Sequence, residues 1–131
     1  MTTLLALYRR PEGGDDAQAT FERRYADEHL PLVAATPGLR GVRVRRVTQP
    51  LLGDRDVILV TTMAFDDRAA LDAGLASDEM RAAGRNLRDI APGLATLLVL
   101  EDVPEMTDML DSDAVASPAV DTVGTTVEER P

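Results

Sequence analysis

The chain has 131 residues, with 14 basic and 23 acidic side chains and a formal net charge of −9. Its length is that of one domain, which excludes a two-domain cofactor enzyme. Because it has no Cys and one His, disulfides, thiolate nucleophiles and cysteine-based metal sites are excluded, and we expect neither metal nor cofactor. The negative charge and the 3% aromatic content argue against nucleic acid as a partner.

The acidic residues are concentrated near the C-terminal end. Residues 1–100 carry 13 Arg and 14 Asp or Glu, a net charge of −1, whereas residues 101–131 carry one Arg and nine acidic residues, a net charge of −8. We therefore expect a domain at residues 1–103 and an acidic extension at 104–131. Apolar residues within the extension predict that it packs on its own or the partner subunit, with one helical turn near 105–111.

No targeting or membrane-spanning signal is visible. The N-terminal apolar run is short and lacks a basic leader, unlike a secretory signal. No stretch approaches the roughly 18 apolar residues of a membrane-spanning helix. We expect a cytoplasmic protein that does not contact a membrane.

The first third of the chain predicts a strand and a long helix. Leu4–Tyr8 is a short apolar run, broken at Pro11–Gly14. Apolar residues at helical spacing then predict a helix over about 16–35, with Asp15 or Asp16 as its N-cap. Pro31 falls inside this helix and predicts a kink near residues 27–31.

The remaining elements complete a β-α-β-β-α-β order. Valine alternates with arginine over 42–47, as in an edge strand, and Val57–Phe65 is rich in β-branched residues. A second helix is expected to begin at Asp66 or Asp67 and to restart at Ser77, before a last strand over 94–100. This order predicts the α+β ferredoxin-like fold, with one four-stranded antiparallel sheet and both helices on one face.

Three of the predicted strands are apolar on both faces. A sheet covered on one face normally alternates apolar and polar residues, but Leu94–Leu100, Val57–Val60 and Leu4–Leu7 do not. Since the two helices can cover only one face, we predict that a second copy of the chain covers the other, in an obligate homodimer.

The first predicted helix carries the candidate catalytic residues. Phe21, Tyr25 and His29 are spaced i, i+4, i+8, so they share one side, with Tyr25 and His29 at the border between the buried stripe and solvent. Histidine can give or take a proton near neutral pH, and tyrosine can orient it or polarise a carbonyl. The alternative is structural: His29 would pack at the kink and donate to a backbone carbonyl freed by Pro31.

A second candidate set is formed by five arginines. They lie at the end of the first predicted strand and on the second: Arg9, Arg10, Arg43, Arg45 and Arg46. They could gather into an anion site, or they could be solvated or paired with acids, including those of the extension.

Several of these segments together resemble the EthD family. The resemblance is carried by the sequence at 8–11 (YRRP), 21–25 (FERRY), 29–32 (HLPL) and 37–39 (PGL), and it covers residues 4 to about 102. It implies a dimeric α/β barrel. Relatives include fungal cofactor-independent dehydratases, cyclases and decarboxylases that act on polyketides, and the family name comes from a gene grouped with an ether-degrading oxygenase system.

Carried onto this chain, the resemblance implies that His29 is the acid or base of a pocket and Tyr25 its neighbour. We expect Phe21, Tyr8 and Leu32 to line the pocket, between the helices and the sheet. Three functions remain open. The first is cofactor-independent acid/base chemistry, of oxidoreductase, lyase or cyclase type, on a small hydrophobic carbonyl or aromatic molecule. The others are a non-catalytic ligand-binding module for a partner oxygenase and a structural dimer without a pocket.

Overall fold

A computed structural model describes residues 1–107 and divides the chain into two units, Met1–Glu101 and Asp102–Pro131. The first unit contains strands β1 (Thr2–Arg9), β2 (Leu39–Arg46), β3 (Val57–Phe65) and β4 (Ala95–Glu101). Its helical elements are α1 (Gly14–Arg24), η1 (Tyr25–His29), α2 (Leu30–Ala34), α3 (Arg68–Leu75) and α4 (Asp78–Ile90).

The described part of the second unit contains one helical turn, α5 (Pro104–Thr107). The expected turn near 105–111 overlaps it at three residues. The rest of the predicted extension lies outside the described residues, and so does its expected packing.

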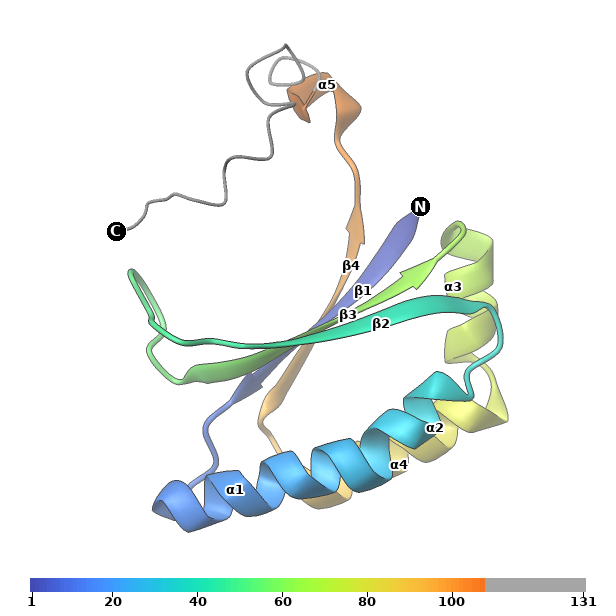
Figure 1. Cartoon of the computed structure of the whole chain (residues 1–131). Coiled ribbons are helices and arrows are strands. Elements are labelled where there is room, and N and C mark those ends of the chain that lie inside the picture. Colours follow the sequence, from blue (N-terminus) through green and yellow to red (C-terminus); the bar gives the residue numbers. More distant parts are fainter. Residues whose placement is uncertain (108–131) are drawn as a thin grey trace. The chain divides into compact units, whose positions relative to one another are not determined.

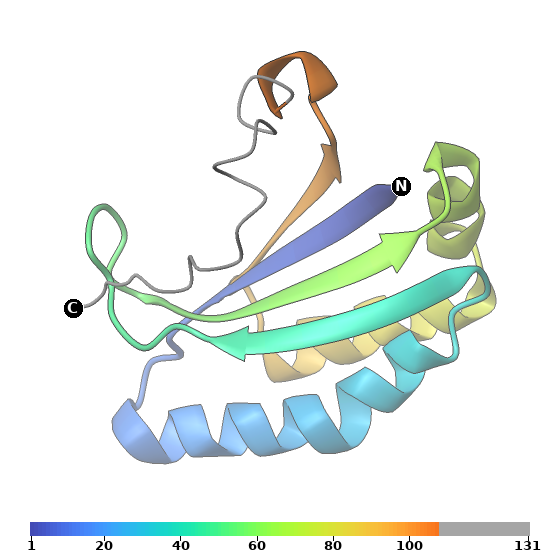
Figure 2. The same cartoon turned by 45° about the horizontal axis from the view of Figure 1, so that its top comes forward.

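The four strands form one antiparallel sheet in the order β2-β3-β1-β4. Within Met1–Glu101, α1, α2 and α4 lie against one face of this sheet (Figures 1 and 2). The α+β, ferredoxin-like arrangement predicted from the element order is therefore confirmed. The arginine-bearing strand β2 lies at an edge of the sheet, as its alternation predicts.

Strand pairing sorts the side chains onto two faces. In β1, every second residue from Thr2 to Tyr8 is buried, and these residues pair with buried residues of β3 such as Met63 and Phe65. Because successive residues of a strand point to opposite faces, this set faces the helices. The core of the unit lies between the sheet and its helical layer.

The opposite side of the sheet, which we call the open face, is covered by no helix of this unit. The register places on it Thr3, Leu5, Leu7, Arg43, Arg45, Val60, Thr62, Ala64, Thr96, Leu98 and Leu100. Leu98 and Leu100 remain exposed there. The strands are thus apolar on both faces, but the helices of this unit cover only one of them.

Side-chain caps determine where helices α3 and α4 begin. The side chain of Asp67 accepts a hydrogen bond from the backbone N–H of Ala70 at 2.8 Å, and Ser77 accepts one from Met80 at 3.1 Å. The predicted start and restart are thus confirmed. The N-cap predicted at Asp15 or Asp16 is wrong.

Helix α1 instead begins after Gly13, whose φ of 112° turns the chain into the helix. This left-handed conformation is open to glycine and costly for other residues. Asp15 and Asp16 consequently fall in the first helical turn, where their charges favourably meet the positive end of the helix dipole.

The kink predicted near Pro31 is a π-helical turn. The N–H of Leu30 donates to the carbonyl of Tyr25, five residues earlier. Proline has no N–H and cannot donate to the carbonyl four residues before it. The α-helical hydrogen bond is therefore missing at Pro31, and the wide turn η1 lies directly before this position. The helical layer continues from α1 into α2 without a break in the helix.

The close approach of α3 to β3 depends on Gly74. A Cβ there would lie 2.9 Å from Cε2 of Phe65 and 3.2 Å from the carbonyl oxygen of Pro37. We expect Gly74→Ala to lower the free energy of unfolding by about 1–3 kcal/mol, because overpacking outweighs the gain in helix propensity. Urea denaturation measures this change.

The matched control is Gly84→Ala in α4, where the nearest atom to the new Cβ would be 3.9 Å away. This variant is expected to raise the free energy of unfolding by about 0.5–1 kcal/mol through helix propensity. Equal stability of the two variants would contradict the tight contact between Gly74 and Phe65.

Candidate functional site

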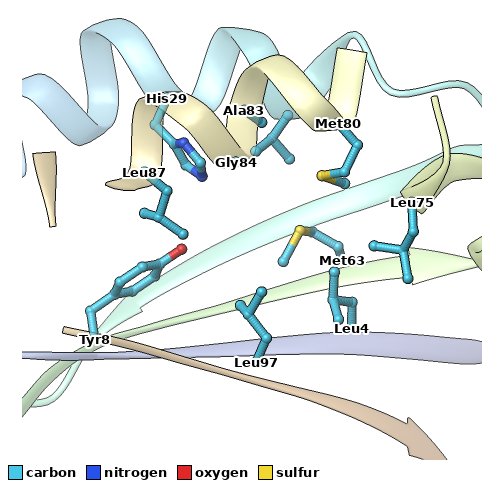
Figure 3. A pocket seen from close by; sticks show the side chains of 11 residues that line it. Leu4, Tyr8, His29, Met63, Leu75, Met80, Ala83, Gly84, Leu87 and Leu97 are labelled. Atoms are coloured by element: carbon cyan, nitrogen blue, oxygen red, sulfur yellow. The ribbon is translucent and has the colours of Figure 1, made fainter. Parts of the chain in front are cut away.

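A cavity of about 110 Å³ lies between the sheet and α4 (Figure 3). Its lining comes from both layers: Leu4, Tyr8, His29, Val33, Met63, Leu75, Met80, Ala83, Gly84, Leu87 and Leu97. Only Tyr8 and His29 among these residues carry a strongly polar side-chain group. The cavity is therefore an apolar space with two hydrogen-bonding groups.

The two polar groups enter from opposite layers. Figure 3 shows the imidazole of His29 extending from the helical layer, with one ring nitrogen on the cavity side, and the hydroxyl of Tyr8 extending from β1. Their backbones belong to η1 and β1, which are packed elements of the fold. The side chains are thus held on a rigid scaffold.

The wide turn places Tyr25 and His29 next to each other. Their ring centroids are 5.1 Å apart, with an angle of 29° between the ring planes. Tyr25 is 2% and His29 4% exposed, so the prediction that they lie at the border with solvent is wrong. His29 is buried by tertiary packing, because η1 packs against α4 and α4 covers the imidazole.

Three buried hydroxyl groups form a chain that ends at the cavity. The hydroxyl of Tyr25 donates to that of Tyr8 at 3.0 Å and lies 2.6 Å from Oγ1 of Thr61. Since Tyr25 has one proton and gives it to Tyr8, Thr61 must donate to Tyr25. The hydroxyl of Tyr8 can then donate its own proton in a hydrogen bond to a ligand in the cavity.

Burial keeps both phenols protonated. It raises the pKa of Tyr8 far above its ordinary value, and the neighbouring Tyr25 adds to the effect. Burial also raises the pKa of Tyr25, while its hydrogen bonds with Thr61 and Tyr8 act in the opposite direction. At neutral pH, Tyr8 is therefore a neutral hydrogen-bond donor.

His29 belongs to a second network, which leads from the cavity toward solvent. Its Nδ1 lies 3.2 Å from Oδ1 of Asn86, and Nδ2 of Asn86 donates to Oε1 of Glu28 at 3.0 Å. Glu28 also accepts two hydrogen bonds from Arg24, at 2.8 and 3.0 Å. Burial lowers the pKa of His29, while its hydrogen bonds to Asn86 and the Ala83 backbone oppose this shift.

The structure brings together some of the predicted site residues. Tyr8 and His29 line the cavity, and Tyr25 lies behind them, in contact with both. Phe21 does not line it: its ring packs against Tyr8 and Tyr25, at centroid distances of 5.8 and 5.7 Å. Leu32 is also not part of the lining and packs at the edge of the core.

Sequence reasoning did not identify Thr61 or Asn86. Thr61 shares the helix-facing side of β3 with Met63 and Phe65, so the period-two pattern could have placed its hydroxyl in the core. Asn86 follows the inward-facing Ala83 by three residues, the spacing of helix neighbours. No sequence signal pairs either residue with its partner.

The five arginines do not form one anion site. Arg9 pairs with Asp54 and Asp56, and Arg46 pairs with Glu22. Arg10 donates to the side chain of Gln18. The remaining two, Arg43 and Arg45, lie on the open face.

Residues 1–107 contain neither a cluster of metal-ligating side chains nor a membrane-spanning helix. In that part of the chain, no three or more His, Asp or Glu side chains are grouped so that they could hold a metal ion. None of its helices has both the length and the apolar character needed to cross a bilayer.

The fold and site define a ferredoxin-like α+β domain with a small apolar cavity that presents a histidine and a tyrosine. The family model of the EthD domain matches residues 17–109. The chain therefore belongs to the EthD domain family. No protein among those with curated functional descriptions matches it.

Solved structures include one member of this family and other proteins with a similar fold. An EthD family protein from Bacillus halodurans C-125 is 32% identical, with a TM-score of 0.70 over 79% of this chain and 99% of that chain. A dimeric protein of unknown function and ferredoxin-like fold from Bacteroides fragilis is 15% identical, with a TM-score of 0.59 over 77% and 95% of the two chains. A dimeric ferredoxin-like protein from Jannaschia sp. CCS1 is 22% identical, with a TM-score of 0.57 over 78% and 100%.

Proposed function

We propose that the domain binds a small apolar molecule with a carbonyl or phenol group and that His29 moves a proton on it without a cofactor. One observation carries this proposal: a hydrogen-bond donor and a neutral imidazole extend from opposite layers into one apolar cavity. Apolar walls with a few converging polar groups and a shifted pKa are the usual marks of a small-molecule site.

The geometry suggests a division of roles. The O–H of Tyr8 donates to the carbonyl oxygen of the ligand, and the imidazole of His29 takes a proton from the adjacent carbon. The electron pair of the broken C–H bond forms a C=C bond to the carbonyl carbon, and the π pair of the C=O bond moves onto the oxygen, where the hydrogen bond from Tyr8 stabilises the developing charge. The resulting enolate, formed beside the protonated His29, is the common entry to elimination and cyclisation and, where an external oxidant is supplied, to oxidation. Tyr25 acts through Tyr8, since it donates to that hydroxyl.

The cavity also limits the size of the enclosed group. Its volume is about 110 Å³, and a cavity of about 150 Å³ accepts benzene. The enclosed part of a ligand is thus a short acyl group or a small ring. Leu75 and Leu97 are part of the lining and remain exposed, at 38% and 52%, so a larger ligand would extend past them.

Binding without chemistry is the second candidate, and the apolar lining favours it independently of His29. Nine of the eleven lining residues are aliphatic residues, methionine or glycine, and their side chains carry no strong hydrogen-bonding group. A carrier or accessory module needs no more than this. The cavity itself argues against a purely structural role.

We further propose that the functional unit is a homodimer that buries the open face in a dimeric α/β barrel. This proposal is supported by the apolar residues on that face and by relatives described as dimeric. A second copy brings an identical apolar sheet, which suits a self-complementary interface.

A matched ligand panel tests the binding proposal. Cyclopentanone and phenol are compared with cyclopentane and benzene in thermal-shift titrations. The oxygen-bearing compounds are expected to raise the melting temperature more than the hydrocarbons of the same size, because only they accept the hydrogen bond from Tyr8. Ligand at about a hundred times its Kd adds about 2.7 kcal/mol to the free energy of unfolding.

Tyr8→Phe should remove the preference for oxygen-bearing compounds, because it deletes only the hydroxyl. The control Leu52→Ala, at a side chain that is 96% exposed, should keep it. Equal shifts for ketone and hydrocarbon in the wild-type protein would contradict the proposed role of Tyr8, and no shift with any compound would contradict the binding proposal.

A further inference from the structure

We propose that Asn86 is a positioning residue that fixes the neutral imidazole of His29 as the Nδ1–H tautomer and leaves Nε2 to accept a proton in the cavity. The inference depends on the proposed function only for the purpose of this tautomer, which is to let Nε2 accept a proton from the ligand. The tautomer follows from the network of Arg24, Glu28, Asn86 and His29, which exists without a ligand.

The first step concerns Glu28. An ionised carboxylate can only accept hydrogen bonds. Arg24 binds both of its oxygens, and this contact lowers the pKa of Glu28 below its ordinary value. Glu28 therefore remains an acceptor in mildly acidic solution. The atom of Asn86 that faces it at 3.0 Å must be the amide nitrogen, which donates.

The second step follows from the two ends of the amide. With its nitrogen directed to Glu28, Asn86 presents Oδ1 to His29, 3.2 Å from Nδ1. An amide oxygen can only accept, so Nδ1 must carry the proton. In the neutral ring the other nitrogen then has a free lone pair. Burial lowers the pKa of His29 and thus favours this neutral ring at neutral pH.

Besides Asn86, the ring also bonds to the backbone carbonyl of Ala83. Ala83 precedes Asn86 by three residues on α4, the spacing of neighbours on one side of a helix, and its carbonyl, like Oδ1 of Asn86, can only accept. Tyr25 stacks on the imidazole through its ring face and uses its hydroxyl on Tyr8 and Thr61. The charged groups of the network are paired with each other, since Arg24 also binds Asp89 at 2.8 Å. Tyr8 faces the ring across the cavity and is held protonated by burial.

The identity of residue 86 matters under this scheme. Aspartate would accept from Nδ1–H but would have no amide to donate to Glu28 and would add a second carboxylate beside it. Leucine would fill the same space without a hydrogen bond. Asparagine alone of these three connects an acceptor-only carboxylate to a neutral imidazole.

The single histidine of the chain permits a direct test. Protein labelled with ¹⁵N in histidine gives the resonances of one imidazole, and the two nitrogen shifts identify the tautomer. We expect the ligand-free wild-type protein at neutral pH to show a protonated Nδ1 and a bare Nε2. A protonated Nε2 in the wild type would overturn the proposal without any variant.

Variants then separate positioning from simple packing. Asn86→Leu is expected to lose the single Nδ1–H tautomer and to shift the midpoint of the His29 titration to lower pH, because a hydrogen bond that favours the protonated ring is removed. Glu28→Gln removes the carboxylate that fixes the orientation of the Asn86 amide. The amide can then flip, and a mixture of His29 tautomers is expected. The control Gln18→Leu, which removes another amide bound to a glutamate, should leave the His29 resonances unchanged.

The same spectra show whether each variant is folded, through the dispersion of the backbone signals. An unchanged tautomer in folded Asn86→Leu would refute the role of Asn86. If that variant does not fold, Glu28→Gln decides the matter. A correct tautomer without any ligand binding would instead refute the proposed function and leave the positioning role intact.

Discussion

Replacing Leu98 by aspartate is expected to convert a dimer into a monomer. Leu98 lies on the open face opposite Leu5 of β1 and is 43% exposed in the single chain. In the proposed dimer it would be buried against the partner. An unpaired carboxylate buried there costs about 3 kcal/mol or more, which corresponds to at least about a hundredfold increase in the dissociation constant.

Sedimentation velocity at micromolar concentration measures this change. The control is Leu52→Asp, which introduces the same charge at an exposed loop residue and should leave the dimer intact. A monomeric wild-type protein would refute the dimer, and a fully dimeric Leu98→Asp would show that the open face is not the interface.

Replacing His29 by alanine is expected to slow proton transfer on a bound ketone by about 10²–10⁴-fold, the usual contribution of a positioned general base. The reaction can be observed without knowledge of the natural substrate. Cyclopentanone in D₂O exchanges its α-protons when an enol forms, and nuclear magnetic resonance follows the loss of the proton signal. Leu52→Ala serves as the control, and circular dichroism verifies that His29→Ala is folded.

The pH dependence of this exchange has a definite sign. The base must be unprotonated to accept a proton, and burial lowers the pKa of His29 below its ordinary value. The enzymatic rate should therefore rise with pH and reach its plateau at a lower pH than free imidazole would. Exchange at the same rate in wild type and His29→Ala would contradict a proton-transfer role and favour ligand binding alone.

The parts of the fold set by local rules could be predicted from the sequence. Val57–Phe65 has the bounds of β3, and the caps at Asp67 and Ser77 begin their helices as expected. Each of these signals lies within a few residues of the structure that it determines. The start of α1 was missed because the backbone conformation of Gly13, and not a side-chain cap, begins that helix.

The candidate site could be predicted only in part, since its geometry depends on distant contacts. His29 was recognised as a candidate, but its burial depends on α4, and its partner Asn86 is 57 positions away. Likewise, Thr61 joins the hydroxyl chain 36 positions after Tyr25. A periodic pattern shows which side of an element is inward. It does not show which two inward side chains will meet.

The wide turn at Tyr25–His29 makes the spacing of the residues as important as their identity. Removing one residue from it would allow an ordinary α-helix, but one residue corresponds to a rotation of about 100° and a rise of about 1.5 Å. The imidazole would then leave the cavity although the histidine remained in the sequence. When homologous chains are aligned, a one-residue gap between Phe21 and His29 is therefore expected to accompany loss of this arrangement, even where both aromatic residues and the histidine are retained.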